Sequence, residues 1–327
     1  MKAMVLHEIS NLADNRKPLR LEDRSDPSPG EGDILIKVTA CGVCHTELDE
    51  IEGRTPPPKF PIILGHQVVG NVVDAGAQAK RFATGDRVGV GWIFSACGRC
   101  KFCHLGKENL CAEFKATGRD ADGGYAEYMT VPEGFAYPIP EVFADVEAAP
   151  LFCAGAIGYR SLRLTGIRDG QRLGLTGFGA SAHLVLKMSR FRYPKSQIYV
   201  FARSEKERDF AKELGAVWAG DTAEEPPEKL DCIIDTTPAW KPVVEALKSL
   251  TPGGRLVINA IRKESRDQDY LLNLDYPKHL WLEKEIKSVA NVARSDVSEF
   301  LDLAARIPIK PDVQEFALAD ANDALLE

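Results

Sequence analysis

Residues 171–187 read Gln-Arg-Leu-Gly-Leu-Thr-Gly-Phe-Gly-Ala-Ser-Ala-His-Leu-Val-Leu-Lys, and this stretch decides the fold of the second half of the chain. The first part, residues 171–176, has the length and the apolar character of a buried strand. The small residues that follow permit a tight turn, and the apolar run beyond them predicts a helix. The stretch is therefore a strand, a turn and a helix in direct succession.

The same alternation continues to about residue 290. Each predicted strand is nearly all apolar, and a helical segment follows most of them. The predicted strands are residues 197–201, 217–218, 231–235, 255–259 and 285–289; the predicted helices begin at the capping residue Ser204, ending at Gly215, and at Lys241, ending before residues 252–254. Alternating helices and apolar strands predict an α/β fold with a buried, doubly wound parallel sheet.

The first third of the chain has a different texture. Residues 33–40, 67–73 and 86–90 have the character of short strands, and glycine, proline and irregular loops separate them. This part predicts a β-rich domain with many loops. In the tail, residues 295–307 predict an amphipathic helix, residues 314–317 a strand, and Asp320 the start of a last helix.

The turn after the first strand predicts a dinucleotide site. Residues 177–182 have the form G-x-G-x-x-A, in which small residues let the backbone approach a pyrophosphate at the N-terminus of a helix. The pattern alone is weak evidence, but its place between the first strand and helix of an alternating series supports it. The predicted cofactor contacts here are Gly177, Gly179, Ala180 and Ser181.

The end of the second strand predicts which dinucleotide binds. Sites for NAD usually end this strand with an acidic residue for the ribose, whereas this chain has Arg203 and Ser204 after Phe201 and Ala202. A guanidinium fork and a hydroxyl suit a 2′-phosphate, and Lys206 and Arg208 add positive charge. We expect NADP(H) in preference to NAD(H). NAD(H), with Arg203 as a solvated surface residue, is the alternative.

Four cysteines lie close together at Cys97, Cys100, Cys103 and Cys111, in a segment rich in glycine and charge. Four sulfur donors at this spacing are typical of a closed, tetrahedral structural zinc site. Two disulfides are the alternative, but nothing else in the chain suggests secretion. The cluster predicts a zinc-bound loop at about residues 95–113.

Length and charge limit the class of protein. A chain of 327 residues favours two domains, and a net charge of −7 gives no electrostatic reason to expect nucleic acid or an anionic membrane as partner. No apolar stretch has the length of a membrane span or the form of a signal peptide. We therefore expect a cytoplasmic protein whose eight cysteines are reduced.

Three further soft donors are far apart: Cys44, His66 and Cys153. Two thiolates and an imidazole would leave the fourth position of a zinc ion open, as a catalytic site requires. Their spacing does not connect them, because an isolated cysteine is usually only a small buried apolar residue.

A family resemblance makes this connection. In order, the chain contains Gly42-Val-Cys44-His45-Thr46-Glu47, Gly65-His66-Gln-Val-Val-Gly70, Gly85-Asp-Arg-Val88, the four-cysteine loop, Cys153-Ala-Gly155 and the nucleotide turn. This series resembles the zinc-dependent alcohol dehydrogenases of the medium-chain dehydrogenase/reductase superfamily. The resemblance implies a GroES-like catalytic domain of residues 1–154 and 291–327, a Rossmann domain of residues 155–290, and an active site in the cleft between them.

The resemblance also assigns roles. It makes Cys44, His66 and Cys153 the catalytic zinc ligands, which gives two zinc ions per chain; Cys41 is then a structural neighbour and Cys232 a core residue. Thr46 would take the substrate proton, His45 would contact the cofactor pyrophosphate, and Glu47 would hold the ring of His66. The relatives often have a histidine at the end of the proton relay, where this chain has Asp49. The Asp49 carboxylate could accept the proton, or the relay could empty into water. The relatives also often have glutamate where this chain has Gln67, and they usually continue beyond Glu327 with a helix and a closing strand.

The substrate is predicted only by class. Trp92, Phe94 and Phe114 are candidate pocket walls. Trp92 and Thr46 resemble the yeast-type and cinnamyl-type branches, which implies primary alcohols and aldehydes as substrates. A polyol or secondary-alcohol dehydrogenase is one alternative, although those branches commonly replace the second cysteine ligand with a carboxylate. A non-catalytic NADPH-binding protein is another.

Residues 285–289, as an exposed edge strand, would suit a homodimer or homotetramer.

Overall fold

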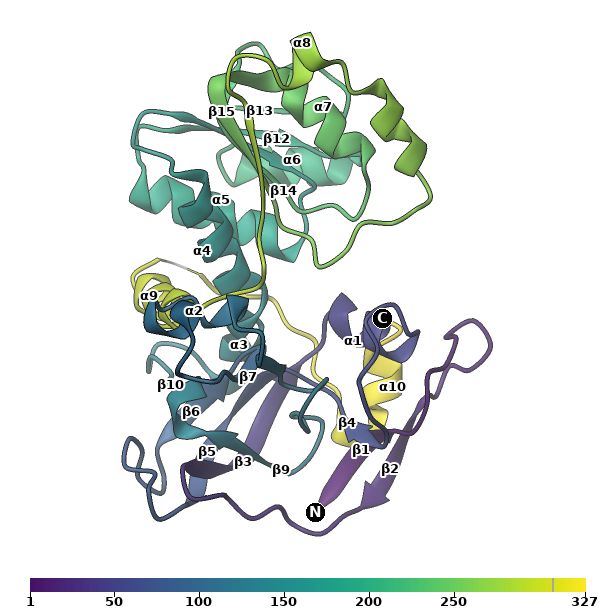
Figure 1. The fold of residues 1–327 in the computed structure, drawn as a ribbon, viewed down its shortest axis with the longest axis vertical. Coiled ribbons are helices and arrows are strands. Elements are labelled where there is room, and N and C mark those ends of the chain that lie inside the picture. Colours follow the sequence, from purple (N-terminus) through teal and green to yellow (C-terminus); the bar gives the residue numbers. More distant parts are fainter. Residues whose placement is uncertain (308) are drawn as a thin grey trace. The chain divides into compact units, whose positions relative to one another are not determined.

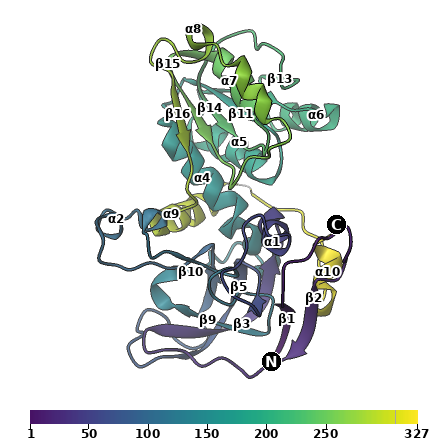
Figure 2. The same cartoon turned by 45° about the vertical axis from the view of Figure 1, so that its right-hand side comes forward.

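The computed structural model describes residues 1–307 and 309–327, which form two compact units. Unit 1 contains Met1–Cys153, Val292–Ala305 and Lys310–Glu327, and unit 2 is centred on Ala154–Asn291. Figure 1 and Figure 2 show the elements of both units. None of the described helices is long and apolar enough to cross a membrane.

Unit 1 is built from antiparallel strands in three sheets, with the orders β2-β1-β4, β10-β6-β5-β3-β9 and β7-β8. Its strands are β1 (Lys2–Leu6), β2 (Leu19–Asp23), β3 (Asp33–Gly42), β4 (Ile62–Ile63), β5 (Gln67–Ala75), β6 (Arg87–Val90), β7 (Ile93–Ser95), β8 (Lys115–Ala116), β9 (Tyr128–Pro132) and β10 (Ala136–Pro138). The inward side chains of β3, β5 and β6, such as Ile36, Val68 and Val88, are fully buried and form the core of the five-stranded sheet. Burial of these β-branched residues stabilises the sheet on which the site of unit 1 is built.

Helices of unit 1 are short and lie mainly in connections. They are α1 (His45–Ile51), α2 (Lys101–His104), α3 (Asp145–Ala148), α9 (Arg294–Ala304) and α10 (Ala321–Ala324), with 3₁₀ turns η1 (Glu108–Leu110), η2 (Glu133–Phe135), η3 (Ala149–Phe152) and η5 (Leu318–Asp320). The C-terminal α10 lies against β1 and β2, where Ala321 and Leu325 join the core cluster of β1 and Asn322 pairs with the backbone of Leu19. The tail of the chain therefore completes the N-terminal sheet.

Unit 2 contains a six-stranded parallel sheet with the order β13-β12-β11-β14-β15-β16. Its elements are α4 (Ala154–Thr165), β11 (Arg172–Thr176), α5 (Ala180–Arg192), β12 (Gln197–Phe201), α6 (Glu205–Glu213), β13 (Trp218–Gly220), β14 (Leu230–Asp235), α7 (Lys241–Ser249), β15 (Leu250–Ile258), η4 (Gln268–Asn273), α8 (Tyr276–His279) and β16 (Glu285–Ser288). Figure 2 shows α7 on one side of the sheet and α5 on the other. The strand order reverses beside β11, so the carboxyl ends of β11, β12 and β14 meet where ligands bind in open α/β sheets.

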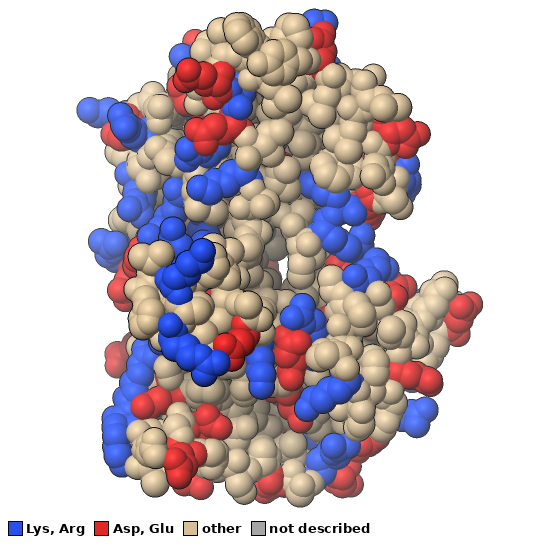
Figure 3. All heavy atoms as spheres, viewed as in Figure 1, with Lys and Arg blue, Asp and Glu red and all other residues tan. Residues whose placement is uncertain are grey.

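The structure confirms the α/β class and the predicted strands of the second half, but the predicted strand at residues 314–317 is wrong. This segment has no strand partner among the described residues, and Phe316 is 38% exposed. The alternation there is short, and Pro311 and Asp312 precede it, both of which disfavour a strand. Side chains of both charges share the face shown in Figure 3.

Candidate active site and metal centres

The four-cysteine loop brings its sulfurs to zinc-binding distance. Cys97 Sγ lies 3.9 Å from Cys103 Sγ, and Cys100 Sγ lies 3.6 Å from Cys103 Sγ. Sulfurs about 2.3 Å from a tetrahedral zinc ion are roughly 3.8 Å apart, so the set fits this metal. All eight cysteines of the chain are unbonded to one another, so the structure does not support the disulfide alternative.

Backbone geometry prepares the loop for a cation. The amides of Cys97 and Glu113 point at Cys111 Sγ, at 3.5 and 3.3 Å. A hydrogen bond from the backbone of Cys103 is the main reason that the pKa of Cys100 falls to about 6. The loop is fixed to α9, because Arg294 Nε donates to the buried Glu108 at 2.8 Å. Burial and the contact with Cys100 raise the pKa of Cys103 to about 12, so the two neighbouring thiols shift in opposite directions.

The three distant donors also meet. Cys44 Sγ lies 3.7 Å from His66 Nε2 and 4.0 Å from Cys153 Sγ, and all three donor atoms are within 4.8 Å of one another. A tetrahedral zinc ion would place two sulfurs about 3.8 Å apart and a sulfur and a nitrogen about 3.6 Å apart. The set therefore fits zinc with one coordination position left for another ligand.

Local structure explains why each donor lies here. Cys44 is the N-cap of α1, where its sulfur accepts the amide of Thr46 at 3.4 Å. His66 directly precedes β5, after Gly65, whose φ of +97° and contact with Tyr125 leave no room for a side chain. Cys153 ends η3. A helix cap, a strand start and a turn end thus position one donor each.

Glu47 connects two of these donors. Its Oε2 accepts the backbone N–H of Cys44 at 2.9 Å, and its Oε1 lies 2.6 Å from His66 Nδ1. Glu47 is fully buried, so both contacts are shielded from water. Such a carboxylate fixes the tautomer and orientation of a metal-binding histidine, which leaves Nε2 free to bind the ion.

The charges of this cluster favour a cation. The hydrogen bond with Cys153, together with burial, raises the pKa of the Cys44 thiol well above its usual value. Burial opposes protonation of His66, but Glu47 and Cys44 together outweigh it and raise the pKa of His66 well above its usual value. The thiol of Cys44 therefore ionises readily only when a cation takes the place of its proton. The donor chemistry therefore agrees with the distances.

The sequence prediction overlooked Glu50. This side chain is fully buried, and among the described residues neither carboxyl oxygen has a hydrogen-bond partner. Burial and then the charge of Glu47 raise the pKa of Glu50 to about 9. Glu47 and Glu50 are three residues apart in α1, a spacing that places both on one helix face and could have revealed the pair.

The predicted relay residues lie on the same helix. Thr46 is half-buried and His45 exposed, both in the first turn of α1. Asp49 is 5% exposed, and its Oδ1 accepts Arg54 Nε at 2.5 Å. Arg54 makes Asp49 one half of an ion pair, which the sequence did not predict.

Trp92 and Gln67 are buried beside the donor cluster. The Trp92 ring is 5% exposed and meets the His66 ring edge-on at 5.1 Å. Gln67 is 2% exposed, and its Nε2 has no partner among the described residues. Trp92 therefore forms part of the wall next to a candidate ligand.

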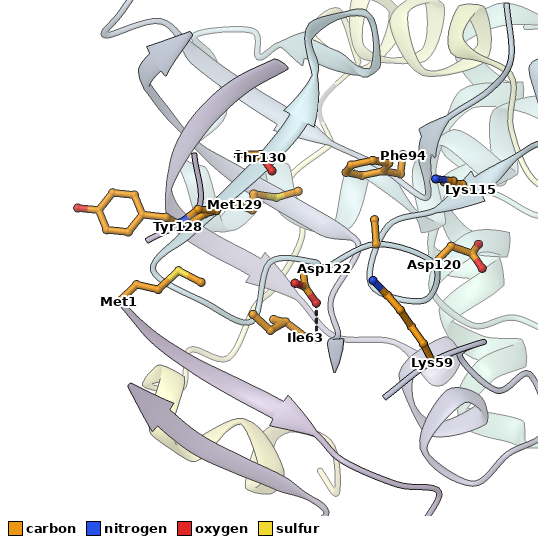
Figure 4. A pocket seen from close by; sticks show the side chains of 12 residues that line it. Met1, Lys59, Ile63, Phe94, Lys115, Asp120, Asp122, Tyr128, Met129 and Thr130 are labelled. Atoms are coloured by element: carbon orange, nitrogen blue, oxygen red, sulfur yellow. Dashed lines mark hydrogen bonds between the residues drawn. The ribbon is translucent and has the colours of Figure 1, made fainter. Parts of the chain in front are cut away.

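The other two aromatic candidates lie elsewhere. Phe94 and Phe114 pack against the core of the five-stranded sheet. Figure 4 shows Phe94 in a cavity of about 260 Å³ with Lys59, Lys115 and Met129; no candidate zinc ligand is among the described residues that line it. Of the three aromatic candidates, Trp92 is the one that contacts a candidate zinc ligand.

The nucleotide turn has the expected backbone. Gly177 has a φ of +76°, and a Cβ there would lie 2.9 Å from Thr236 Oγ1 and from Thr237 Cγ2. Gly179 is the N-cap of α5, with open space around it, and Ala180 begins the helix. Ser181 is half-buried. The turn thus exposes the N-terminus of a 13-residue helix, which favours an anion.

The end of β12 carries the predicted basic residues, and Ser204 is the helix cap that the sequence predicted. Arg203 is exposed, but the Ser204 hydroxyl donates to Glu207 at 2.7 Å and accepts the Glu207 amide at 3.2 Å. This is the capping box of α6. Arg208 donates to the carbonyls of Ala202 and Arg203. Arg203 is therefore the available partner for a phosphate, while Ser204 already caps a helix.

A closed four-sulfur cluster, an open three-donor cluster and a Rossmann-type nucleotide turn in one chain define the class of zinc-binding dehydrogenases. Comparison with known proteins agrees. Residues 30–141 match the family model of the alcohol dehydrogenase GroES-like domain. The chain is 42% identical over 313 residues to a chain named as a probable alcohol dehydrogenase from Mycobacterium tuberculosis, covering 94% of this chain and 88% of that one. It is 33% identical over 339 residues to an alcohol dehydrogenase from Geobacillus stearothermophilus, covering 99% and 94%.

Solved structures share the architecture. A cinnamyl alcohol dehydrogenase from Sorghum bicolor superposes with a TM-score of 0.84 at 26% identity, covering 99% of this chain and 93% of that one. A protein described as a putative zinc-binding dehydrogenase from Sinorhizobium meliloti, bound to NADP, superposes with a TM-score of 0.82 at 27% identity. The match covers 94% of this chain and 90% of that one. The chain belongs to the zinc-type alcohol dehydrogenases of the medium-chain superfamily, with a GroES-like and a Rossmann domain. It is an alcohol dehydrogenase.

Proposed function

We propose that this enzyme interconverts primary alcohols and aldehydes with NADP(H), at a catalytic zinc site made of Cys44, His66 and Cys153. The observation that carries the proposal is the meeting of these three donors within 4.8 Å, with Glu47 behind His66. The second zinc ion would be held by the four-cysteine loop. When bound, the catalytic zinc supplies Lewis-acid polarisation of the substrate oxygen, and the nicotinamide carries the hydride.

The residues around the donors would orient the substrate and move its proton. Thr46 is the proposed hydroxyl that exchanges the proton of the substrate. Asp49, three residues further along α1, is on a neighbouring position of the same helix face. Because Asp49 is already paired with Arg54, we do not assign it as the proton acceptor. The proton would then leave to water.

The cofactor preference rests on Arg203. It is exposed at the end of β12, where an acidic residue would favour NAD, and the relative from Sinorhizobium meliloti was solved with NADP bound. Gly177, Gly179, Ala180 and Ser181 would surround the pyrophosphate, and His45 would contact it. Ser204 would contribute chiefly its backbone N–H, because its hydroxyl is used by Glu207.

The substrate preference rests on Trp92. A large ring packed against His66 narrows the space beside the donors, which favours an unbranched carbon next to the reacting oxygen. The cinnamyl alcohol dehydrogenase among the similar structures supports the same branch. Cys153 as third donor argues against the polyol branches, which commonly use a carboxylate there.

We also propose a homodimer or homotetramer. The edge strand β16 is exposed along its whole length, and the nearby Trp281, Leu282 and Ile286 are 55%, 50% and 46% exposed. An exposed edge strand with apolar neighbours is a natural site for pairing with a second copy.

The decisive experiment is a panel of aldehydes and alcohols assayed with NADPH and with NADH by nicotinamide absorbance. We expect turnover of primary alcohols and aldehydes, with NADPH favoured over NADH. Preference for secondary alcohols and ketones would contradict the proposed substrate class, and preference for NADH would contradict the proposed cofactor. Arg203→Asp should shift the cofactor preference towards NADH. The control Arg168→Asp changes an exposed arginine that precedes β11 and should leave the preference unchanged.

A further inference from the structure

A buried lysine in unit 2 has no place in the reaction described so far. Lys263 follows β15, and its side chain is only 9% exposed. Its ammonium group contacts the carboxylate of Asp235 and donates to the carbonyls of Thr237 at 2.7 Å and Ala239 at 3.0 Å. An ammonium group has three protons, so every donor of Lys263 is used.

The partner carboxylate collects donors from three segments. Asp235 ends β14 and is fully buried. Besides Lys263, its Oδ1 accepts the hydroxyl of Thr176 at 2.5 Å and that of Thr237 at 2.8 Å. Thr176 ends β11, Thr237 follows β14, and Lys263 follows β15. One carboxylate therefore joins the ends of three neighbouring strands.

This network reaches the nucleotide turn directly. Thr237 lies against Gly177, the first glycine of the turn. From the other side, the Asn259 amide donates to the carbonyl of Asp235 at 2.7 Å, and Asn259 Nδ2 lies 3.4 Å from the hydroxyl of Ser181. The residues after β15 and β14 thus touch both ends of the G-x-G-x-x-A segment.

The position of the network in the sheet indicates which part of a dinucleotide it affects. The sheet order places β14 and β15 on one side of β11 and β12, with Arg203, on the other. Ligands lie across the carboxyl ends of such strands. If β12 takes the adenosine end, the ends of β14 and β15 face the nicotinamide end. A fully satisfied buried network is stiff, and removing one partner leaves an uncompensated charge.

We propose that the Lys263–Asp235 pair holds the loops after β14 and β15 in the arrangement that binds the nicotinamide half of the cofactor. Lys263 and Asp235 are positioning residues, acting through Thr237, Asn259 and the turn. The inference rests on the proposed dinucleotide function, but it does not depend on the choice between NADP and NAD.

The test compares a whole cofactor with its adenosine fragment. Dissociation constants for NADPH and for 2′,5′-ADP are measured by calorimetry on the zinc-loaded full-length enzyme and on Lys263→Met. We expect NADPH to bind at least tenfold more weakly and 2′,5′-ADP to bind within twofold of the wild type. The control Lys229→Met removes an exposed lysine that donates to the carbonyl of Lys248, and it should change neither constant.

Other outcomes decide against the inference. NADPH binding within twofold of the wild type, or equal weakening of both ligands, would make the pair a general structural element. If Lys263→Met does not fold, the double variant Lys263→Met/Asp235→Asn leaves no unpaired charge and is measured in the same way. If the wild type prefers NADH, the NADP proposal fails. The dissociation constants of NADH and AMP then provide the same test of the Lys263–Asp235 pair.

Discussion

The two sulfur-containing clusters of unit 1 reach similar donor distances by different routes. Cys97, Cys100, Cys103 and Cys111 lie within one loop, and its backbone alone brings them together. Cys44, His66 and Cys153 come from a helix cap, a strand start and a turn end, and depend on the packing of the whole unit. A local set can hold an ion with little help, whereas a dispersed set needs a buried support such as Glu47.

The difference also separates their roles. The loop offers four donors and closes the coordination of an ion, so its metal would contribute to stability. The dispersed set offers three, beside Trp92 and Thr46, so its metal would contribute to the reaction. Variants of the two clusters should therefore separate loss of activity from loss of stability.

The largest effect should come from His66→Ala. Loss of one of three donors removes the catalytic ion and its polarisation of the substrate, so kcat should fall by about 10³-fold or more. Metal analysis by mass spectrometry should show one zinc ion per chain in place of two. Retained activity with one zinc ion would contradict the assignment of the dispersed set as catalytic.

The opposite pattern is expected for Cys103→Ser. Breaking the closed set should lower the melting temperature by about 5–10 °C, because metal binding there adds to folding free energy. At a temperature where the variant stays folded, kcat should remain within about threefold of the wild type, because the other set still holds its ion. Cys232→Ala, a buried cysteine outside both clusters, should keep two zinc ions. A large loss of kcat with an unchanged melting temperature would contradict the structural role of the four-cysteine loop.

A smaller effect is expected for Glu47→Gln. The amide keeps the shape of the side chain but loses the charge that holds His66 and the backbone of Cys44. Zinc affinity of the dispersed set should fall by about 10–100-fold, measured by competition with a chelator. Affinity of the four-cysteine loop should not change. Glu52→Gln, one turn further along and paired with Arg54, is the matched control; equal effects of both variants would remove the special role of Glu47.

The smallest effect concerns Glu50→Gln and depends on pH. The ordinary pKa of 4.5 becomes about 9 in the folded, metal-free protein, chiefly through burial. Between these values the folded chain holds a proton that the unfolded chain releases, so the free energy of unfolding falls as pH rises. Glutamine has no proton to lose. The free energy of unfolding of the variant should therefore rise relative to that of the wild type between pH 5 and pH 8.5, by on the order of 2 kcal/mol.

Thermal unfolding of the metal-free protein across this pH range measures the gain. Glu8→Gln, an exposed site, should show no such trend. A difference in unfolding free energy between variant and wild type that stays constant with pH would mean that Glu50 is ionised in the folded state. Zinc at His66 should narrow this difference, because a nearby cation favours the carboxylate.

Much of this molecule was predictable from local patterns. The strands β11, β12 and β14 follow from short, nearly all-apolar runs. The cap of α6 at Ser204 and the four-cysteine loop follow from residues that are neighbours both in sequence and in space. The strand predicted at residues 314–317 failed for the opposite reason. A strand requires a partner, and four residues of alternation do not supply one.

The nucleotide turn and the closed cysteine set were predictable from the sequence because each depends on residues a few positions apart, and the parallel sheet was predictable because apolar strands and helices alternate along the chain. The family resemblance implied that Glu47 holds His66, but the tertiary structure alone showed that Arg54 pairs with Asp49 and that Lys263 reaches Asp235. Such contacts join segments through burial, where a polar group must find a partner wherever the fold places one. Side-chain identity shows which groups need partners, and packing selects among the candidates.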